Sequence, residues 1–305
     1  MNPIRTILAV TDFSAGSTLA AQRAAMLAAE SGAGMILLHV VEPDGVLTLR
    51  DWLAKGRDLR AAVADQAGMQ LDAQADEIEQ RQGVRVDRRI RAGRFLDEVH
   101  EASIGSDLVV LGASGERGAR EAALGTRADR LVRTAARPVL VVKGPPARSY
   151  ARALVLTDFS TAAEAATRAA LAVVGEGAVH LLHAFCIPFE GKLRLAGVGD
   201  EDIAAYRREV RDRALGQMQQ ALSGVNAPER IQSSVVPGDI RTEALRAIDR
   251  LRPDLIAVGK QGESLLEDML LGSTTSHMLD RAGCDVLVVP RRAGDGLAER
   301  AGESH

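Results

Sequence analysis

Cysteine and aromatic residues are scarce in this sequence. Its 305 residues include two cysteines, Cys186 and Cys284, which stand in neither a CxxC motif nor a metal-ligand spacing. Two cysteines are too few for a disulfide framework, so we expect both to be small buried apolar side chains in a reducing compartment. Aromatic residues make up 3% of the chain, and the hydrophobic cores must therefore consist of Ala, Val, Leu and Ile.

Strong charge of one sign and long apolar runs are also missing. The formal net charge is −3, and no block of Lys and Arg is interleaved with aromatic residues, which argues against nucleic acid or an anionic membrane surface as a partner. No apolar run reaches the roughly 18 residues that a membrane-spanning helix needs. The strand-like segment Ile7–Val10 begins so close to Met1 that a signal peptide has no room. We therefore expect a cytoplasmic protein.

The sequence does contain an internal repeat with an offset close to 147 residues. Four blocks of the first half return in the same order in the second half: Ile7–Ser14 as Ala153–Ser160, Leu37–His39 as Leu181–His183, Asp107–Gly112 as Asp254–Gly259, and Pro138–Val142 as Asp285–Val289. Chance does not keep four blocks in order, so we predict two copies of one domain. The predicted boundaries are 1–143 and 152–290, with a Pro- and Gly-containing linker at 144–151 and a flexible tail at 291–305.

Within each copy, short apolar runs alternate with helical patterns. The runs lack a polar–apolar alternation, which is typical of strands that are covered on both faces. Alternation through five strands predicts an α/β fold: two repeated parallel-sheet domains, each with helices on both faces and right-handed crossovers. In such sheets, ligands bind beyond the carboxyl ends of the strands. Residues that directly follow strands are therefore the candidates for a site.

A glycine pattern follows the fourth predicted strand of each copy. Copy one has Gly112 and Gly115, then nine residues, then Gly125 with Thr126. Copy two repeats this spacing, and its residues are Gly259, Gly262, Gly272, Ser273 and Thr274. The first two glycines allow a sharp turn and a close approach of the backbone to a ligand. The third opens a helix, where free N–H groups and the helix dipole favour a phosphate.

An aspartate follows the first strand of each copy, next to the glycine pattern in such a sheet. Asp12 and Asp158 stand in the same four-residue segment, Thr-Asp-Phe-Ser. A carboxylate at this place can accept hydrogen bonds from ribose hydroxyls. Both aspartates could instead simply cap the helices that follow them, and the glycines could serve only the turn.

The combined pattern resembles the ATP-binding pattern of the universal stress protein family, and it does so in both copies. It consists of T-D-F-S after the first strand and of G-x-x-G, nine residues and G-[S/T] after the fourth. The resemblance implies a Rossmann-like fold of the adenine-nucleotide alpha-hydrolase type that binds ATP, with or without Mg²⁺. It implies that the aspartate and the backbone at the end of strand two hold ribose and adenine, and that the glycine segment holds the phosphates. The implied residues are Asp12, Val41, Gly112, Gly115, Gly125 and Thr126 in copy one, and Asp158, Gly259, Gly262, Gly272, Ser273 and Thr274 in copy two.

The two copies depart from this pattern differently. Arg127 follows Gly125-Thr126, where it could clamp a phosphate or fill its site. Phe185 stands where a small residue would contact adenine, so we expect a narrowed base pocket in copy two. The nine-residue segment is basic in copy one and acidic in copy two, with Arg117 and Arg120 against Glu263, Glu267 and Asp268. Motif completeness favours copy two and charge favours copy one, so the sequence leaves the occupied copy open.

Catalytic motifs are absent from the sequence. It has no G-x-x-x-x-G-K-[S/T] loop, no G-x-G-x-x-G opening the first helix and no paired carboxylates placed for magnesium. We therefore expect a nucleotide-dependent stress-response sensor or regulator that acts on an unknown protein partner and hydrolyses ATP slowly at most. The alternatives are a ligand-free interaction scaffold and a weak ATPase. His39 and His183 invite a metal or proton-transfer role, but we expect backbone-bonded residues at the edges of buried strands.

The last strand of each copy is an apolar edge. These strands are Val139–Val142 and Val286–Val289, and members of the resembled family typically dimerise through this strand. The resemblance implies that the two copies pair within the chain as a pseudo-dimer. A further homodimer is compatible with the sequence, which does not specify it.

Overall fold

The short apolar segments of the sequence form the strands of one sheet in the computed structural model of the protein. The structure describes residues 4–42, 58–113, 125–186, 195–225, 228–260 and 271–291. The first half consists of β1 (Thr6–Thr11), α1 (Ala15–Ser31), β2 (Gly34–Val41), α3 (Asp58–Gln82), β3 (Val86–Ala92), α4 (Phe95–Ser103), β4 (Leu108–Gly112), α5 (Thr126–Thr134) and β5 (Val139–Val142). The second half consists of β6 (Arg152–Leu156), α6 (Thr161–Val173), β7 (Ala178–Phe185), α8 (Asp200–Ser223), the 3-10 turn η1 (Pro228–Arg230), β8 (Ile231–Pro237), α9 (Ile240–Leu251), β9 (Leu255–Lys260), α10 (Ser273–Arg281) and β10 (Asp285–Pro290).

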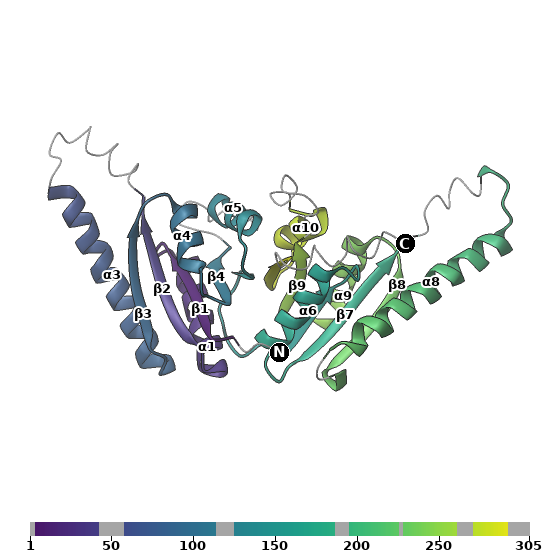
Figure 1. Ribbon diagram of the computed structural model, residues 1–305, viewed down its shortest axis with the longest axis horizontal. Helices are drawn as coiled ribbons and strands as arrows, with labels where there is room; N and C mark the ends of the chain where they lie inside the picture. The colour runs from purple at the N-terminus through teal and green to yellow at the C-terminus, as the bar shows by residue number, and fades with distance from the viewer. Residues whose placement is uncertain are drawn as a thin grey trace, which may run out of the picture.

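The two halves repeat one topology within a ten-stranded sheet. The strand order is β3-β2-β1-β4-β5-β10-β9-β6-β7-β8, so each half has its first strand in the middle and its fifth strand at the shared centre. Pairing is parallel within each half and antiparallel between β5 and β10. Figure 1 shows α3 and α8 at opposite ends of the molecule, beside β3 and β8. The predicted α/β fold with repeated parallel halves is confirmed.

Helices cover both faces of the sheet, and each face has its own core. On one face, side chains of α1, α3, α6 and α8 pack on the strands, as Ala24, Leu71, Ala166 and Met218 illustrate. On the other face, α4, α5, α9 and α10 do the same. Alanine on α1 and α6 lets these helices lie close to the strands, which is how a chain with few aromatic residues closes its cores.

The halves join through the apolar edges that the sequence predicts. Val139, Leu140 and Val141 pair with Val288, Leu287 and Val286 in antiparallel register, and these side chains are at most 1% exposed. The chain therefore forms the expected intrachain pseudo-dimer. Because the sheet continues across the boundary, neither fifth strand is left as an open edge.

Two lysines reach across this boundary in opposite directions. Lys143 Nζ follows β5 and donates to the carbonyls of Leu279 (2.5 Å) and Ala282 (2.7 Å) at the end of α10. Lys260 Nζ, at the end of β9, donates to the carbonyl of Arg133 in the last turn of α5. Each cation thus satisfies carbonyls at the negative end of a helix in the other half. Burial lowers the pKa of Lys143.

A buried polar cluster fixes the same boundary. The Asp285 carboxylate accepts hydrogen bonds from the Tyr150 hydroxyl (2.5 Å) and the Lys143 backbone N–H (2.8 Å), and it lies 3.7 Å from Nε of Arg23. The Arg23 guanidinium lies 4.1 Å above the centre of the Tyr150 ring and donates to the carbonyl of Arg148. Burial and the neighbouring Asp285 carboxylate raise the pKa of Tyr150. The cluster connects three parts of the chain: α1, β10, and the segment that precedes β6.

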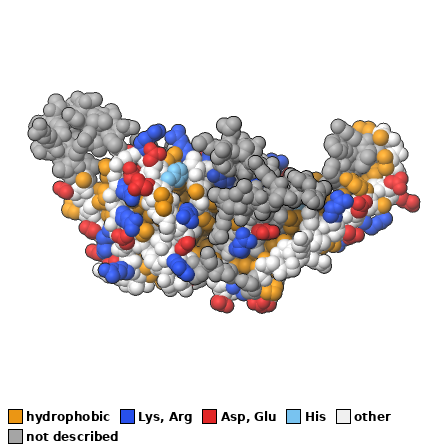
Figure 2. Space-filling model, viewed as in Figure 1, with side chains coloured by type: hydrophobic (Ala, Val, Ile, Leu, Met, Phe, Trp, Pro, Cys, Tyr) orange, Lys and Arg blue, Asp and Glu red, His pale blue; other side chains and the backbone are white. Residues whose placement is uncertain are grey.

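The surface carries charges of both signs. Lys and Arg side chains lie interspersed with Asp and Glu over the face drawn in Figure 2. Within the described ranges, no helix has the length and apolarity needed to cross a membrane. The expectation that both cysteines are buried is wrong, because Cys186 is exposed and Cys284 is half-buried. Cys186 directly follows β7, and its Sγ donates to the carbonyl of Gly238 at 3.1 Å.

Candidate functional site

The segment after the first strand of each half adopts one strained turn. Phe13 and Phe159 have φ values of 62° and 67°, a left-handed conformation that costs a non-glycine residue roughly 1–3 kcal/mol. Each Phe N–H donates to the hydroxyl of the threonine two residues earlier, Thr11 (3.1 Å) or Thr157 (3.0 Å). Each ring packs against a histidine of the neighbouring strand: Phe13 stacks on His39 with centroids 4.4 Å apart, and Phe159 lies tilted against His183 with centroids 4.3 Å apart.

The two histidines support this turn, in agreement with the prediction that each is hydrogen-bonded to the backbone at the end of a buried strand. Nδ1 of His39 lies 2.9 Å from the carbonyl oxygen of Thr11, and Nδ1 of His183 lies 2.8 Å from that of Thr157. Burial lowers the pKa of His39. In both halves the histidine holds strand one and strand two together where the strands end.

The turn directs an aspartate into a short hydrogen-bonded loop. Oδ1 of Asp12 accepts from the N–H of Ser14 at 3.1 Å, and Oδ1 of Asp158 accepts from the N–H of Ser160 at 3.0 Å. The helix caps themselves are the serines, whose hydroxyls accept from Ser17 N–H in α1 and Ala163 N–H in α6. The alternative that the aspartates cap these helices is therefore wrong, because each lies two residues before the cap.

In the second half, one cavity gathers the predicted residues. It has a volume of about 170 Å³ and lies beyond the ends of β6, β7 and β9. Five of its lining residues were predicted from the sequence, namely Asp158, Gly259, Gly272, Ser273 and Thr274. Gly262 lies outside the described residues, as do Gly115 and the charged residues Arg117, Arg120, Glu263, Glu267 and Asp268.

The first turn of α10 closes one side of this cavity. Gly272 is the N-cap, with φ −56° and ψ 148°, and makes no side-chain cap hydrogen bond. The first turn carries no acidic residue, and Ser273, Thr274 and Thr275 all line the cavity. A helix N-terminus with a glycine N-cap and hydroxyl side chains in its first turn provides N–H donors, O–H donors and a positive dipole end.

Sequence reasoning missed part of the cavity. Ala184 lines it, whereas Phe185 is 6% exposed and is not part of its lining. The expected narrowing of this pocket by Phe185 is therefore wrong, since successive side chains of a strand point to opposite faces. Ile240, the first residue of α9, also lines the cavity. Its position after Gly238 and Asp239 was visible in the repeat and could have identified it.

The fourth-strand glycines serve a purpose that the sequence analysis did not anticipate. A Cβ on Gly112 would lie 2.6 Å from the backbone carbonyl of Gly16, and one on Gly259 would lie 2.8 Å from the carbonyl carbon of Ala162. Both strands therefore end against the first turn of the helix that follows strand one, α1 or α6. The glycines are required by this packing, whether or not a ligand is close, so the sequence-based reason for them was incomplete.

In the first half, side chains near the equivalent strand ends contact one another. Gly125 is the N-cap of α5 and, like Gly272, makes no side-chain cap hydrogen bond. Arg127, in the first turn of α5, donates from Nη2 to Oε2 of Glu42, directly after β2. Its guanidinium lies 5.5 Å from the centre of the Phe95 ring. Val41 is half-buried, and its carbonyl accepts from the N–H of Gly93 at 3.1 Å.

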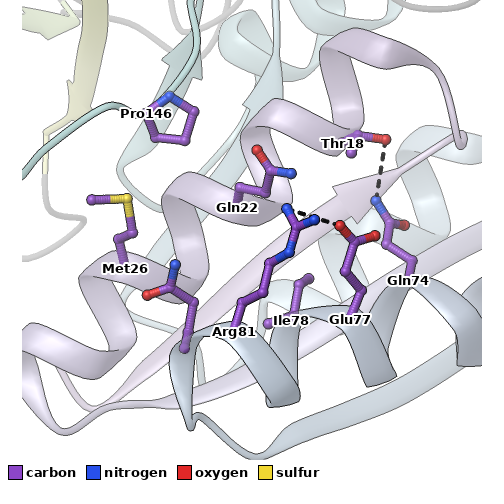
Figure 3. Close-up of a pocket in the computed structure, with 9 residues that line it drawn as sticks. Thr18, Gln22, Met26, Gln74, Glu77, Ile78, Arg81 and Pro146 are labelled. Carbon is purple, nitrogen blue, oxygen red and sulfur yellow. Dashed lines mark hydrogen bonds and ion pairs between the residues drawn. The ribbon is translucent and has the colours of Figure 1, made fainter.

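Two further cavities lie on the face of the sheet that α1, α3, α6 and α8 cover, and none of the predicted residues lines them. The first, of about 170 Å³, lies between α1 and α3 (Figure 3), where Gln74 Nε2 donates to the Thr18 hydroxyl and Arg81 pairs with Glu77. The second, of about 230 Å³, lies in the corresponding place between α6 and α8. Amide and charged side chains of helices predominate in the lining of the first, whereas the second also has several apolar residues, and neither lining includes a glycine N-cap of the described chain.

The topology, the glycine-capped helices and the cavity define the class of this protein: a duplicated Rossmann-like α/β protein with a cavity beyond the strand ends of its second half. Its sequence matches the model of the universal stress protein family at residues 3–143 and again at 149–290. The chain therefore belongs to the universal stress protein family, in a tandem two-domain form.

Individual relatives span nearly the whole chain. A universal stress protein of Mycolicibacterium smegmatis is 27% identical over 291 residues, which cover 94% of this chain and 97% of the relative. The crystal structure of a universal stress protein from Archaeoglobus fulgidus superposes with a TM-score of 0.66 at 21% identity, covering 94% of this chain and 98% of that one. A functionally unknown protein from Pseudomonas aeruginosa superposes with a TM-score of 0.60 at 21% identity, covering 97% and 95%. At this identity the two structures support the shared fold.

Proposed function

We propose that this protein binds an adenine nucleotide, ATP in the first instance, and acts as a stress-response sensor or regulator. One observation carries the proposal: a single cavity of the second half brings together Asp158 from the end of strand one and the glycine-capped start of α10. Membership of the universal stress protein family adds support, because the motif that the sequence repeats resembles the ATP-binding pattern of that family.

The cavity offers separate groups for the separate parts of a nucleotide. The N–H groups at the start of α10, with the hydroxyls of Ser273 and Thr274, suit phosphate oxygens. The Asp158 carboxylate suits ribose hydroxyls, which donate hydrogen bonds. Ala184 and Ile240 provide apolar surface for a base. If Mg²⁺ accompanies the nucleotide, it would neutralise phosphate charge, and Asp158 is the carboxylate of the cavity lining that could approach it.

A regulatory role fits this lining better than catalysis does. The titratable side chains among the described lining residues are Asp158 and His183. Oδ1 of Asp158 accepts from both the N–H and the hydroxyl of Ser160, and Nδ1 of His183 is within hydrogen-bonding distance of a backbone carbonyl. The Ser160 hydroxyl beside Asp158 also caps α6 by accepting from the N–H of Ala163, so this contact is part of the turn that precedes the helix. We therefore propose slow ATP hydrolysis at most, well below about one turnover per second.

The first experiment is to denature the purified protein, identify released nucleotides by mass, and titrate the stripped protein with ATP and Mg²⁺ by calorimetry. We expect an adenine nucleotide or a binding heat with ATP. Neither a bound nucleotide nor a binding heat would reject the proposal and favour the ligand-free interaction scaffold. Turnover faster than about one per second would reject the regulatory reading.

A charge placed on α10 separates binding from stability. In Ser273→Asp, a carboxylate enters a helix first turn that has no acidic residue, so it should stabilise the helix by roughly 0.3–1 kcal/mol through the helix dipole. The same charge should repel a phosphate and weaken ATP binding by at least about tenfold. Thr126→Asp in α5 is the matched control. Unchanged ATP affinity in Ser273→Asp would place the phosphates elsewhere.

A further inference from the structure

Three positions around the candidate site differ between the halves. Glu42, Phe95 and Arg127 in the first half correspond to Cys186, Ile240 and Thr274 in the second. Two of the second-half residues, Ile240 and Thr274, line the strand-end cavity. Their first-half counterparts contact each other instead, since the Arg127 guanidinium lies over the Phe95 ring and pairs with Glu42.

The Glu42 carboxylate is held in place by a second contact. Its Oε1 accepts from the backbone N–H of Phe95, the first residue of α4, at 3.3 Å. The N-cap of α4 is Arg94, which makes no side-chain cap hydrogen bond, whereas the N-cap of α9 is Asp239, which accepts from the N–H groups of Arg241 and Thr242. Glu42 thus supplies from β2 part of the capping that Asp239 supplies locally in the second half.

These contacts bridge the two ends of the place where a nucleotide would lie. Glu42 follows the last residue of β2, where the base would be held, and Arg127 lies in the first turn of α5, where the phosphates would be held. The bridge neutralises the one cation of the α5 first turn, which also contains Asp129. A phosphate approaching α5 would therefore meet the carboxylate of Glu42 and that of Asp129, which is itself paired with Arg133.

We propose that the Glu42–Arg127 pair closes the first-half site, so that the protein holds one nucleotide, in its second half. This inference rests on the proposed function. The side chains of Arg127 and Glu42 are 54% and 36% exposed, and pairs exposed to this degree contribute little to stability. Substituting both residues should therefore remove the proposed barrier and leave the domain folded.

The test is the number of ATP molecules bound per chain, measured by calorimetry on the full-length protein. We expect one for the unsubstituted protein, lost in Asp158→Asn and retained in the matched variant Asp12→Asn. Replacing the pair with the residues of the second half, in Glu42→Cys/Arg127→Thr, should raise the number to two. In that background Asp12→Asn should return it to one.

The other outcomes overturn the inference in different ways. Two molecules bound by the unsubstituted protein would reject closure and leave the proposed function standing; loss of one of them in Arg127→Thr would show that Arg127 clamps a phosphate. One molecule that is lost in Asp12→Asn would place the ligand in the first half. A count that stays at one in the double variant would show that the pair is not the barrier. No binding by either protein would reject the proposed function together with the inference.

Discussion

The two halves share their backbone architecture and differ in the side chains that face the strand ends. Both end strand one with a left-handed Phe on a histidine, and both pack the end of strand four against a helix by means of a glycine. They differ where Arg127 meets Glu42 and where Thr274 lines a cavity. The shared features hold the domain together whatever it binds, so duplication retains them. The side chains beyond the strand ends are free to diverge.

The boundary between the halves also differs from one side of the pseudo-twofold axis to the other. The residues equivalent to Arg23, Tyr150 and Asp285 in the other half are Ala169, Ile4 and Pro138. The buried cluster therefore occurs on one side of the pseudo-twofold axis alone. In a homodimer a symmetric interface repeats every contact, whereas a tandem chain can place a cation on one side and its carboxylate on the other. The boundary has become specific to the pairing of these two unlike halves.

Removing the carboxylate of this cluster should have the largest effect on stability. Asp285→Ala leaves Arg23 buried without its counter-charge and Tyr150 without its acceptor, which should lower the free energy of unfolding by about 3–5 kcal/mol. Urea denaturation measures the change. The double variant Arg23→Met/Asp285→Leu removes both charges and should be much less destabilised. A loss below about 1 kcal/mol in Asp285→Ala would show that the asymmetric cluster does not hold the boundary.

An alanine at each fourth-strand glycine tests the feature that the halves share. Gly112→Ala and Gly259→Ala place a Cβ within 2.6 Å and 2.8 Å of helix backbone, and backbone gives way less readily than a side chain. We expect each to lower the free energy of unfolding by roughly 1–3 kcal/mol, whether or not ATP is present. Gly144→Ala, whose Cβ would have no neighbour within 4 Å, is the control. If ATP-free Gly259→Ala is as stable as the unsubstituted protein, the glycine serves the ligand rather than the packing.

The smallest effect on stability is expected from alkylating the cysteines, which differ sharply in environment. Cys186 is exposed, whereas burial raises the pKa of Cys284 to about 12. At pH 8 the Cys284 thiolate is therefore a negligible fraction, and thiolate is the reactive form. Iodoacetamide at pH 8 should label Cys186 alone, as peptide mass spectrometry would show, without changing the unfolding midpoint. Equal labelling of both cysteines would mean that the boundary around Cys284 opens in solution.

Several features of the fold and of the site could be predicted from residues close together in sequence. The repeat identified the duplicated domain, the apolar runs identified strands buried on both faces, and T-D-F-S marked the turn that carries Asp12 and Asp158. These three depend on local sequence patterns. The pairing of the edge strands Val139–Val142 and Val286–Val289 was implied by the family resemblance, and the structure confirms it.

Other features depend on which residues meet in space. Arg127 and Glu42 are 85 residues apart, and the periodicity of neither segment indicates that they pair. The pattern predicted a base pocket narrowed by Phe185, but Ala184 rather than Phe185 lines the cavity, because successive side chains of β7 point to opposite faces. The motif located Gly112 and Gly259, but the close approach of α1 and α6 explains them.

Local chemistry thus sets where strands end, which turns they make and that the domain occurs twice. Which contacts the side chains at a given strand end make is set by packing, because the same backbone can carry Thr274 beside a cavity or Arg127 against a carboxylate. The long side chains that make this difference find their partners only after the sheet has brought distant strand ends together.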